Sequence, residues 1–301
     1  MTHEDLQRQY PWLRVRTTVE EYVAPDYYDR LLKDYVFEGK TDIEMFREFL
    51  QAAQTRSDSR VLELGCGPGR ATAIAIAELV ARVSSFQLVD LSGQMLAASR
   101  QRFADYPQLS YLQNDSVHHL EQTTDTYDLV FSLWSFSHSV HQILSARGLQ
   151  EGTDYFEGVL RKFIITNLAP GARFFLIHFD SLSDEQRILM RQWKKVFPIF
   201  SNLDQQSPSE QLMSSVLNKL KGEGIIDFQR THHLGDKIVY KDMNEALETF
   251  MNFHMESYFN DSPLLAVVMA ELETYFRDYL TPSGTIEIRP GCFIYTIKRL
   301  A

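Results

Sequence analysis

Three alternating glycines follow an apolar run in the segment 61–70, which reads VLELGCGPGR. Such a strand-to-helix turn lets a ligand lie directly against the main chain, because glycine has no Cβ and accepts positive φ. A dinucleotide site of the form G-x-G-x-x-G would need a third glycine at position 70, which is Arg70. The acidic Glu63 before the turn favours a cationic ligand and would repel a diphosphate. The segment therefore predicts a binding turn whose ligand carries positive charge and no pyrophosphate.

The segments after this turn have the pattern of further strands. Residues 83–90 end in Asp90, about 20 residues beyond the glycines, where a nucleotide-binding unit places the acid that accepts the ribose hydroxyls. Further strands are predicted over 109–112, 127–132 and 173–180. The glycine turn, its acidic residues and this order of strands resemble the class I S-adenosylmethionine-dependent methyltransferases over about residues 61–180. The glycines alone would also suit a tight turn in another α/β protein.

The resemblance implies an α/β fold, with a Rossmann-like and mostly parallel sheet whose last strand is antiparallel. It implies S-adenosylmethionine as the cofactor, with the adenine near Asp115 and the methyl group near the end of the strand 127–132. The cofactor-binding residues that it implies are Glu63, Gly65, Gly67, Gly69, Asp90, Leu91, Met95, Asn114, Asp115, Ser116 and Ser132.

The segment 132–141 is expected to be a loop at the carboxyl ends of the strands, where ligands of such folds bind. It holds Trp134, His138 and His141 close together. An amine acceptor must arrive neutral, whereas a hydroxyl or carboxyl must lose a proton, which a histidine often accepts. His138 and His141 are therefore candidate catalytic residues, and so is His178 if its strand register turns it toward the pocket. The alternatives are that the first two satisfy loop backbone groups and that His178 faces the core.

No metal site is predicted. His232 and His233 are adjacent in the expected sixth strand, 225–234, so they point to opposite faces and cannot hold one metal together. No other histidine, cysteine or acidic group in the sequence has the spacing of a known metal motif.

Residues 1–56 are expected to form a helical lid segment in front of a methyltransferase domain spanning 57–301. Thr41 and Glu44 have the spacing of a capping box at the start of a helix. In many small-molecule methyltransferases such a leading segment folds over the cofactor, so Tyr27 and Tyr28 are predicted substrate-binding residues. Trp134, in the segment 132–141, is a third, as an apolar wall of the acceptor pocket. For the tyrosines, ordinary amphipathic packing is the alternative.

Two helical insertions, at about 183–222 and 242–282, are expected to cap the strand ends. Ser183 and Ser207 each precede a residue of capping-box type by three positions. The second insertion, before the terminal strand 292–297, is too long for a hairpin loop. The order of helix, sixth strand, helical insertion and last strand resembles the histamine-type amine N-methyltransferases, without a match at that family's amine-binding residues.

Composition limits the partners. The chain has 301 residues, of which 44% are hydrophobic, and a formal net charge of −10. Nucleic-acid binding is disfavoured because it needs a basic face. No apolar run has the length of a membrane span, and Met1-Thr-His-Glu-Asp lacks the pattern of a signal peptide. Two cysteines make no disulfide framework, so we expect a cytoplasmic protein, monomeric or homodimeric.

The leading hypothesis is transfer of a methyl group from S-adenosylmethionine to nitrogen or oxygen of a small molecule. Two alternatives stay open. The same site could drive another displacement on S-adenosylmethionine, such as a ring closure that releases methylthioadenosine. The chain could also be a regulatory protein that binds the cofactor without catalysis.

Overall fold

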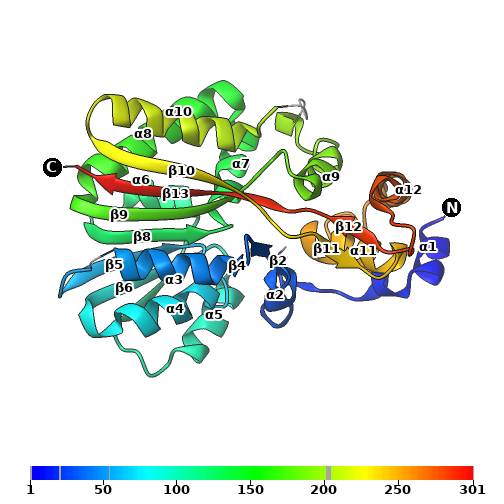
Figure 1. The fold of residues 1–301 in the computed structure, drawn as a ribbon, viewed down its shortest axis with the longest axis horizontal. Coiled ribbons are helices and arrows are strands. Elements are labelled where there is room, and N and C mark those ends of the chain that lie inside the picture. Colours follow the sequence, from blue (N-terminus) through cyan, green and yellow to red (C-terminus); the bar gives the residue numbers. More distant parts are fainter. Residues whose placement is uncertain (1, 20–21, 54, 201–204, 301) are drawn as a thin grey trace.

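The computed structural model describes residues 2–19, 22–53, 55–200 and 205–300, and a seven-stranded sheet forms one half of it (Figure 1). Its strands are β5 (Ser59–Leu64), β6 (Val83–Asp90), β7 (Leu109–Gln113), β8 (Tyr127–Leu133), β9 (Leu168–Phe179), β10 (Ile226–Leu234) and β13 (Gly291–Arg299). They lie in the order β10-β13-β9-β8-β5-β6-β7. The five strands from β9 to β7 are parallel, whereas β13 is antiparallel to both β9 and β10. The predicted Rossmann-like sheet with an antiparallel last strand is confirmed.

Helices cover both faces of this sheet. One face carries α3 (Asp42–Ala52), α4 (Arg70–Leu79) and α5 (Gly93–Arg102), and the other carries α6 (Ser116–Gln122), α7 (Phe136–Arg147), α8 (Leu149–Thr166) and α10 (Pro208–Gly222). Successive side chains of a strand point to opposite faces. Val61 and Leu129 accordingly join the core under α3 and α4, while Leu62 and Val130 join the core under α7 and α8. This alternation fixes the register that brings the carboxyl ends of β5, β6 and β8 together.

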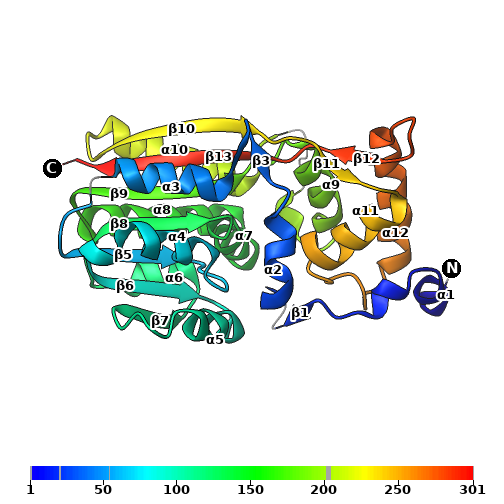
Figure 2. The same cartoon turned by 60° about the horizontal axis from the view of Figure 1, so that its bottom comes forward.

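A second, mainly helical lobe lies beyond the carboxyl ends of the parallel strands (Figures 1 and 2). It comprises α1 (His3–Gln9), η1 (Pro11–Arg14), α2 (Pro25–Leu32), α9 (Asp184–Trp193), η3 (Pro198–Phe200), β11 (Ile238–Tyr240), α11 (Met243–Thr249), the π-helical turn η4 (Phe250–His254), α12 (Leu265–Phe276), η5 (Arg277–Tyr279) and β12 (Ile286–Ile288). Two-residue strands pair as β1 (Thr18–Val19) with β2 (Tyr22–Val23) and as β3 (Val36–Phe37) with β4 (Lys40–Thr41), and η2 (Val80–Arg82) follows α4. β11 pairs with β12, so the segment between them, which holds α11, η4, α12 and η5, begins and ends at two neighbouring strands.

The beginning of the chain packs on the late helices of this lobe. Tyr10 Oη donates to the Glu273 carboxylate at 2.9 Å, and Trp12 Nε1 donates to Asn244 Oδ1 at 3.0 Å. Thr17 Oγ1 donates to the carbonyl of Asn252 at 2.8 Å. The segment expected to be an N-terminal lid is thus divided: its first part belongs to the helical lobe, and α3 lies on the sheet.

The element predictions can be compared with the structure. Thr41, Ser183 and Ser207 cap α3, α9 and α10 through their side chains, as their spacing predicts. The expected loop over 132–141 is wrong, because β8 continues to Leu133 and α7 begins at Phe136. In the predicted insertion 183–222, α9 reaches the helical lobe, whereas α10 packs on α7, α8 and β10. Across the described residues, no helix combines the length and the apolar composition that a bilayer crossing requires.

Candidate active site

The glycine turn joins β5 to α4 at the carboxyl end of the sheet. Gly65, Gly67 and Gly69 have φ values of 69°, 52° and 93°, all in the region that favours glycine. A Cβ at Gly65 would lie 1.8 Å from Ser135 Oγ, so only glycine lets the residues before α7 approach the turn this closely. Gly65 and Gly67 border a cavity of about 120 Å³, which we call the smaller cavity. The sequence therefore exposes main chain to a ligand at this point.

Asp90 is fixed beside the turn at the end of β6. Its Oδ2 accepts a hydrogen bond from the Gly67 amide at 2.8 Å, and its Oδ1 accepts one from the Ser92 amide at 2.9 Å. These two bonds orient the carboxylate beside the turn. Asp90 lines the smaller cavity, and its predicted bond to ribose hydroxyls stays a prediction.

Part of the predicted cofactor set is assembled around the smaller cavity. Of that set, the lining residues are Gly65, Gly67, Asp90, Leu91, Met95 and Ser116. They come from four successive segments of the sheet edge: the glycine turn, the end of β6, the start of α5 and the start of α6. Leu91 and Met95 add apolar surface beside the Asp90 carboxylate.

Two predicted acids do not border this cavity. Glu63 is buried inside the domain, where its Oε2 accepts a bond from Thr72 Oγ1 at 2.6 Å. Burial away from water raises the pKa of Glu63 to about 8. Asp115 caps α6, because its Oδ1 accepts bonds from the amides of Val117 and His118, each at 2.9 Å. Both carboxylates accept hydrogen bonds from the protein itself, and their contact with a cofactor stays a prediction.

Three other predicted positions also lie outside the lining. A Cβ at Gly69 would lie 2.3 Å from the Phe103 ring, so this glycine serves helix packing. The Asn114 amide donates to the Asp90 carbonyl at 3.0 Å and joins two strand ends. Ser132 is fully buried in β8, and its Oγ has no hydrogen-bond partner among the described residues. Cofactor contacts of these three residues likewise stay predictions.

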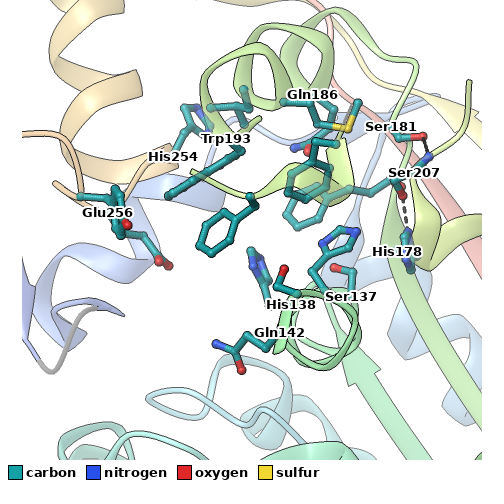
Figure 3. Close-up of a pocket in the computed structure, with 18 of the residues that line it drawn as sticks. Ser137, His138, Gln142, His178, Ser181, Gln186, Trp193, Ser207, His254 and Glu256 are labelled. Carbon is teal, nitrogen blue, oxygen red and sulfur yellow. Dashed lines mark hydrogen bonds between the residues drawn. The ribbon is translucent and has the colours of Figure 1, made fainter. Parts of the chain in front are cut away.

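A larger cavity of about 250 Å³ adjoins the smaller one and is shown in Figure 3. Its walls come from α7, the end of β9, α9 and η4, so the sheet domain and the helical lobe both contribute. The described residues that line both cavities are Tyr22, Leu32, His138, Gln142, Phe179 and Glu256. We call these six residues the shared wall. A ligand in one cavity and a ligand in the other would therefore border the same six side chains.

The predicted substrate-binding residues lie mostly at the smaller cavity. Tyr28 and Trp134 line it, and neither lines the larger cavity. Burial raises the pKa of Tyr28 above its ordinary value. Tyr27 lines neither cavity, and its ring packs 6.1 Å from that of Phe253, which does line the larger one. Direct substrate contact by these three residues stays a prediction.

Trp134 is held by a buried ion pair. Asp42, at the start of α3, accepts hydrogen bonds from both terminal nitrogens of Arg70 and from Trp134 Nε1, the last at 2.8 Å. The paired contact of arginine with a carboxylate fixes direction as well as distance. Trp134 has φ of 67°, which is rare for a bulky side chain. Asp42 therefore connects α3, the helix after the glycine turn and the end of β8.

Of the candidate histidines, His138 and His141 share one face of α7. They are three positions apart, which is about one helical turn. His138 belongs to the shared wall, where its side chain is accessible from the cavities, whereas His141 lines only the larger cavity. Enclosure by protein lowers the pKa of both imidazoles, because it disfavours the charged ring. Both rings are therefore neutral at neutral pH, and each has one ring nitrogen without a proton.

His178 borders the larger cavity in a different state. Its Nδ1 lies 2.8 Å from the carbonyl of Phe179, so this nitrogen carries the proton and donates. Its Nε2 lies 3.2 Å from Ser209 Oγ and accepts from that hydroxyl. Burial lowers the pKa of His178 to about 4. With both nitrogens engaged, His178 is better suited to supporting the cavity wall than to taking a proton from a ligand.

Glu256 is a site residue that sequence reasoning missed. It follows η4 and belongs to the shared wall, and its carboxylate has no hydrogen-bond or ion-pair partner among the described residues. Burial without a partner raises its pKa to about 8. Glu256 and Ser257 have φ of 51° and 54°, so a helical reading of 244–258 could not show where this side chain points. The irregular backbone that places this side chain is visible only in the structure.

The charges around both cavities have one sign. Asp90 and Glu256 are the acidic residues that line them, and no described lysine or arginine does so. A cavity with one sign of charge and low-dielectric walls concentrates ligands of the opposite sign. Within the described ranges, no three histidine, cysteine or acidic side chains come together as metal ligands, and the absence of a metal stays a prediction.

Comparison with known proteins agrees with this geometry. Residues 61–152 match the model of a family described as methyltransferase domain. The YcgJ protein of Bacillus subtilis has a similar structure, with a TM-score of 0.51 and 16% identity over 85% of this chain and 98% of that chain. A putative methyltransferase of Bacillus halodurans gives a TM-score of 0.46 with 13% identity, over 85% of this chain and 99% of that one. The cyclopropane synthase MmaA2 of Mycobacterium tuberculosis gives 0.49 with 16% identity, over 92% and 96%.

The first of these structural likenesses shows the fold, and the family model identifies the segment with the glycine turn. No curated protein matches the sequence. The prediction of a methyltransferase domain is confirmed for the segment 61–152, and the structural likeness confirms the fold.

Proposed function

We propose, from the premise that residues 61–152 belong to the methyltransferase-domain family, that this chain transfers a methyl group from S-adenosylmethionine to nitrogen or oxygen of a small molecule. The observation that carries the proposal is the shared wall. A cavity at the glycine turn and a larger cavity meet at the same six side chains, which is the arrangement that transfer between two ligands requires.

The residues of the smaller cavity fit the cofactor. The positive φ of Gly65 and Gly67 leaves main chain bare for close approach, and Asp90 offers carboxylate oxygens to ribose hydroxyls. The acidic lining suits a ligand that carries a sulfonium and an ammonium. S-adenosylmethionine would supply a methyl carbon for displacement, in which its bond to sulfur breaks and leaves the electron pair on sulfur while the acceptor's lone pair forms the new bond.

The chain's own residues would position the acceptor and manage its proton. His138 stands on the shared wall with a neutral imidazole, so it can accept the proton of a hydroxyl acceptor or orient the acceptor by a hydrogen bond. Glu256, with a pKa of about 8, is the second group there that can take a proton near neutral pH. Trp134 and Phe179 supply apolar surface that excludes water from the reacting atoms.

Calorimetry with S-adenosylhomocysteine tests the cofactor half of this proposal. We expect the wild type to bind it, and Asp90→Asn to bind it about tenfold to a hundredfold more weakly, because a hydrogen bond to a charged group contributes roughly 1.5–3 kcal/mol. The matched control is Asp125→Asn, since Asp125 is exposed and pairs with Arg60 away from both cavities. Equal affinity in the wild type and Asp90→Asn would count against the assignment.

Product analysis tests the reaction. Incubation of the protein with S-adenosylmethionine and candidate acceptors should yield S-adenosylhomocysteine and a methylated acceptor by mass spectrometry. Methylthioadenosine as the product would instead identify a different displacement, and binding without any turnover would favour a regulatory protein.

A further inference from the structure

The larger cavity holds one buried acid that no positive charge of the described chain pairs with. Glu256 is the acidic residue among its described lining residues, and its carboxyl group has no hydrogen-bond or ion-pair partner among the described residues. The nearby histidines do not offset it, because enclosure lowers the pKa of His138, His141 and His254. A buried carboxylate without a partner is costly, so a site that keeps one is suited to a ligand that brings the opposite charge.

The backbone holds Glu256 in this position. Glu256 and Ser257 both have φ in the left-handed region, directly after the π-helical turn η4. The Ser257 amide donates to the Met251 carbonyl at 2.9 Å and closes this bend. Residues other than glycine and asparagine rarely adopt positive φ values, and the exceptions are frequent at functional sites. Figure 3 shows the carboxylate of Glu256 directed into the cavity, toward His138 and Gln142.

The rest of the lining has aromatic character. Trp193, Phe197 and Tyr258 pack as a group, with the Trp193 ring centroid 5.7 Å from that of Phe197 and 5.3 Å from that of Tyr258. Phe253 lies on the same turn as Glu256 and also lines the cavity. Aromatic faces attract cations, most strongly where water is excluded. A carboxylate next to several aromatic rings is complementary to an organic ammonium and not to an anion or a neutral alcohol.

We infer that the methyl acceptor is a small organic amine that enters the larger cavity as an ammonium, pairs with Glu256 and lies against the aromatic side chains. This inference rests on the proposed function and names its substrate class. On pairing with the ammonium, Glu256 would release its own proton to solvent. As a carboxylate it would then take one ammonium proton, the freed nitrogen lone pair would form the new carbon–nitrogen bond, and the carbon–sulfur bond would break with its electrons left on sulfur. The product leaves as a methylated ammonium, so charge and protons balance.

Matched pairs of amines and alcohols test the inference. The probes are 2-phenylethylamine with 2-phenylethanol, benzylamine with benzyl alcohol, and cyclohexylamine with cyclohexanol, each titrated into protein saturated with S-adenosylhomocysteine. We expect the wild type to prefer at least one amine over its alcohol by tenfold or more. Glu256→Gln, which keeps shape and removes charge, should abolish that preference. Glu4→Gln removes an equal charge from the exposed helix α1 and should keep it.

Three results would overturn the inference. One is a panel in which no amine binds better than its alcohol. The second is a preference for amines that persists in Glu256→Gln. The third is a loss of S-adenosylhomocysteine affinity in Glu256→Gln with the amine preference intact, which would assign Glu256 to the cofactor's own ammonium. Failure of the wild type to bind S-adenosylhomocysteine would instead contradict the proposed function, so the two failures are distinguishable.

Discussion

At the scale of single residues, the three candidate histidines of the site differ in what their ring nitrogens do. His138 faces both cavities, His141 faces one, and His178 has both nitrogens in hydrogen bonds. The sequence alone predicts that these three histidines lie near the site, because ligands of such folds bind at the carboxyl ends of the strands. The hydrogen bonds of His178 could not be predicted in the same way, since one of them involves Ser209, which lies in a helix 31 positions later.

His178 should make stability depend on pH. Its pKa is about 4 in the folded state and about 6.5 in an unfolded chain, so between these values the unfolded state binds more protons. This contribution is complete above pH 6.5 and is lost as pH falls toward 4. Relative to His178→Gln, the wild type should lose up to about 1.4 kcal/mol of unfolding free energy per pH unit in this window. Urea denaturation of both proteins at several pH values measures it, and a constant difference would contradict the assignment.

Glycines and acids of the turn could be predicted because their chemistry is local. Gly65, Gly67 and Asp90 border the smaller cavity, since one turn and one strand end place all three, and their contact with a cofactor stays a prediction. Glu63 and Asp115 show the limit of this reasoning. A carboxylate at a strand end can face a ligand or satisfy neighbouring donors, and here Thr72 and the amides of α6 occupy these two.

At the scale of elements, strands were predicted better than the connections between them. The segment 83–90 forms β6 with the expected bounds, because alternation and a terminal acid mark it clearly. The segment 132–141 was expected to be a loop, yet α7 begins at Phe136. Its serines and histidines are weak helix formers, and packing of Phe136, Val140 and Leu144 on the sheet decides its conformation.

Asp42 should be the residue whose loss loosens the elements around the glycine turn. Asp42→Asn removes the charge that pairs with Arg70, and breaking a buried pair in this way costs about 3–5 kcal/mol. Glu48→Gln is the control on the same helix, because its pair with Lys40 is exposed and should contribute no more than about 1 kcal/mol. Denaturant midpoints of the two variants should therefore differ clearly. Similar midpoints would show that Asp42 does not hold these elements together.

At the scale of the whole molecule, the site lies between two bodies built from interleaved parts of the chain. The sheet domain and the helical lobe both line each cavity: the glycine turn and the end of β6 border the smaller one, and η4 and α9 border the larger one with α7. The sequence indicated helices in both insertions, but it could not indicate that the first residues of the chain pack on the last helices. Contacts such as Tyr10 with Glu273 join side chains 263 positions apart, and no local pattern encodes them.

Trp12 should control the order of the helical lobe more than that of the sheet. Its buried ring and its bond to Asn244 join η1 to α11. Trp12→Ala should cost about 3–5 kcal/mol, as large-to-small changes in a core do, and hydrogen exchange should quicken in α11 and α12 before it does in β5 and β8. Leu149→Ala, at a site with 49% exposure, should change stability by less than about 0.5 kcal/mol. Unchanged protection in α12 would contradict this dependence.

The shared wall has a consequence for inhibitor chemistry. Because six side chains border both compartments, a single synthetic compound that tethers an adenosine to an amine arm could fill both at once. Such a bisubstrate compound would lose its freedom of motion once instead of twice, so a linker of the right length would give an affinity well beyond that of either half. The selectivity of that compound would reside in the arm facing Glu256, since bare main chain at a glycine turn distinguishes few proteins of this fold.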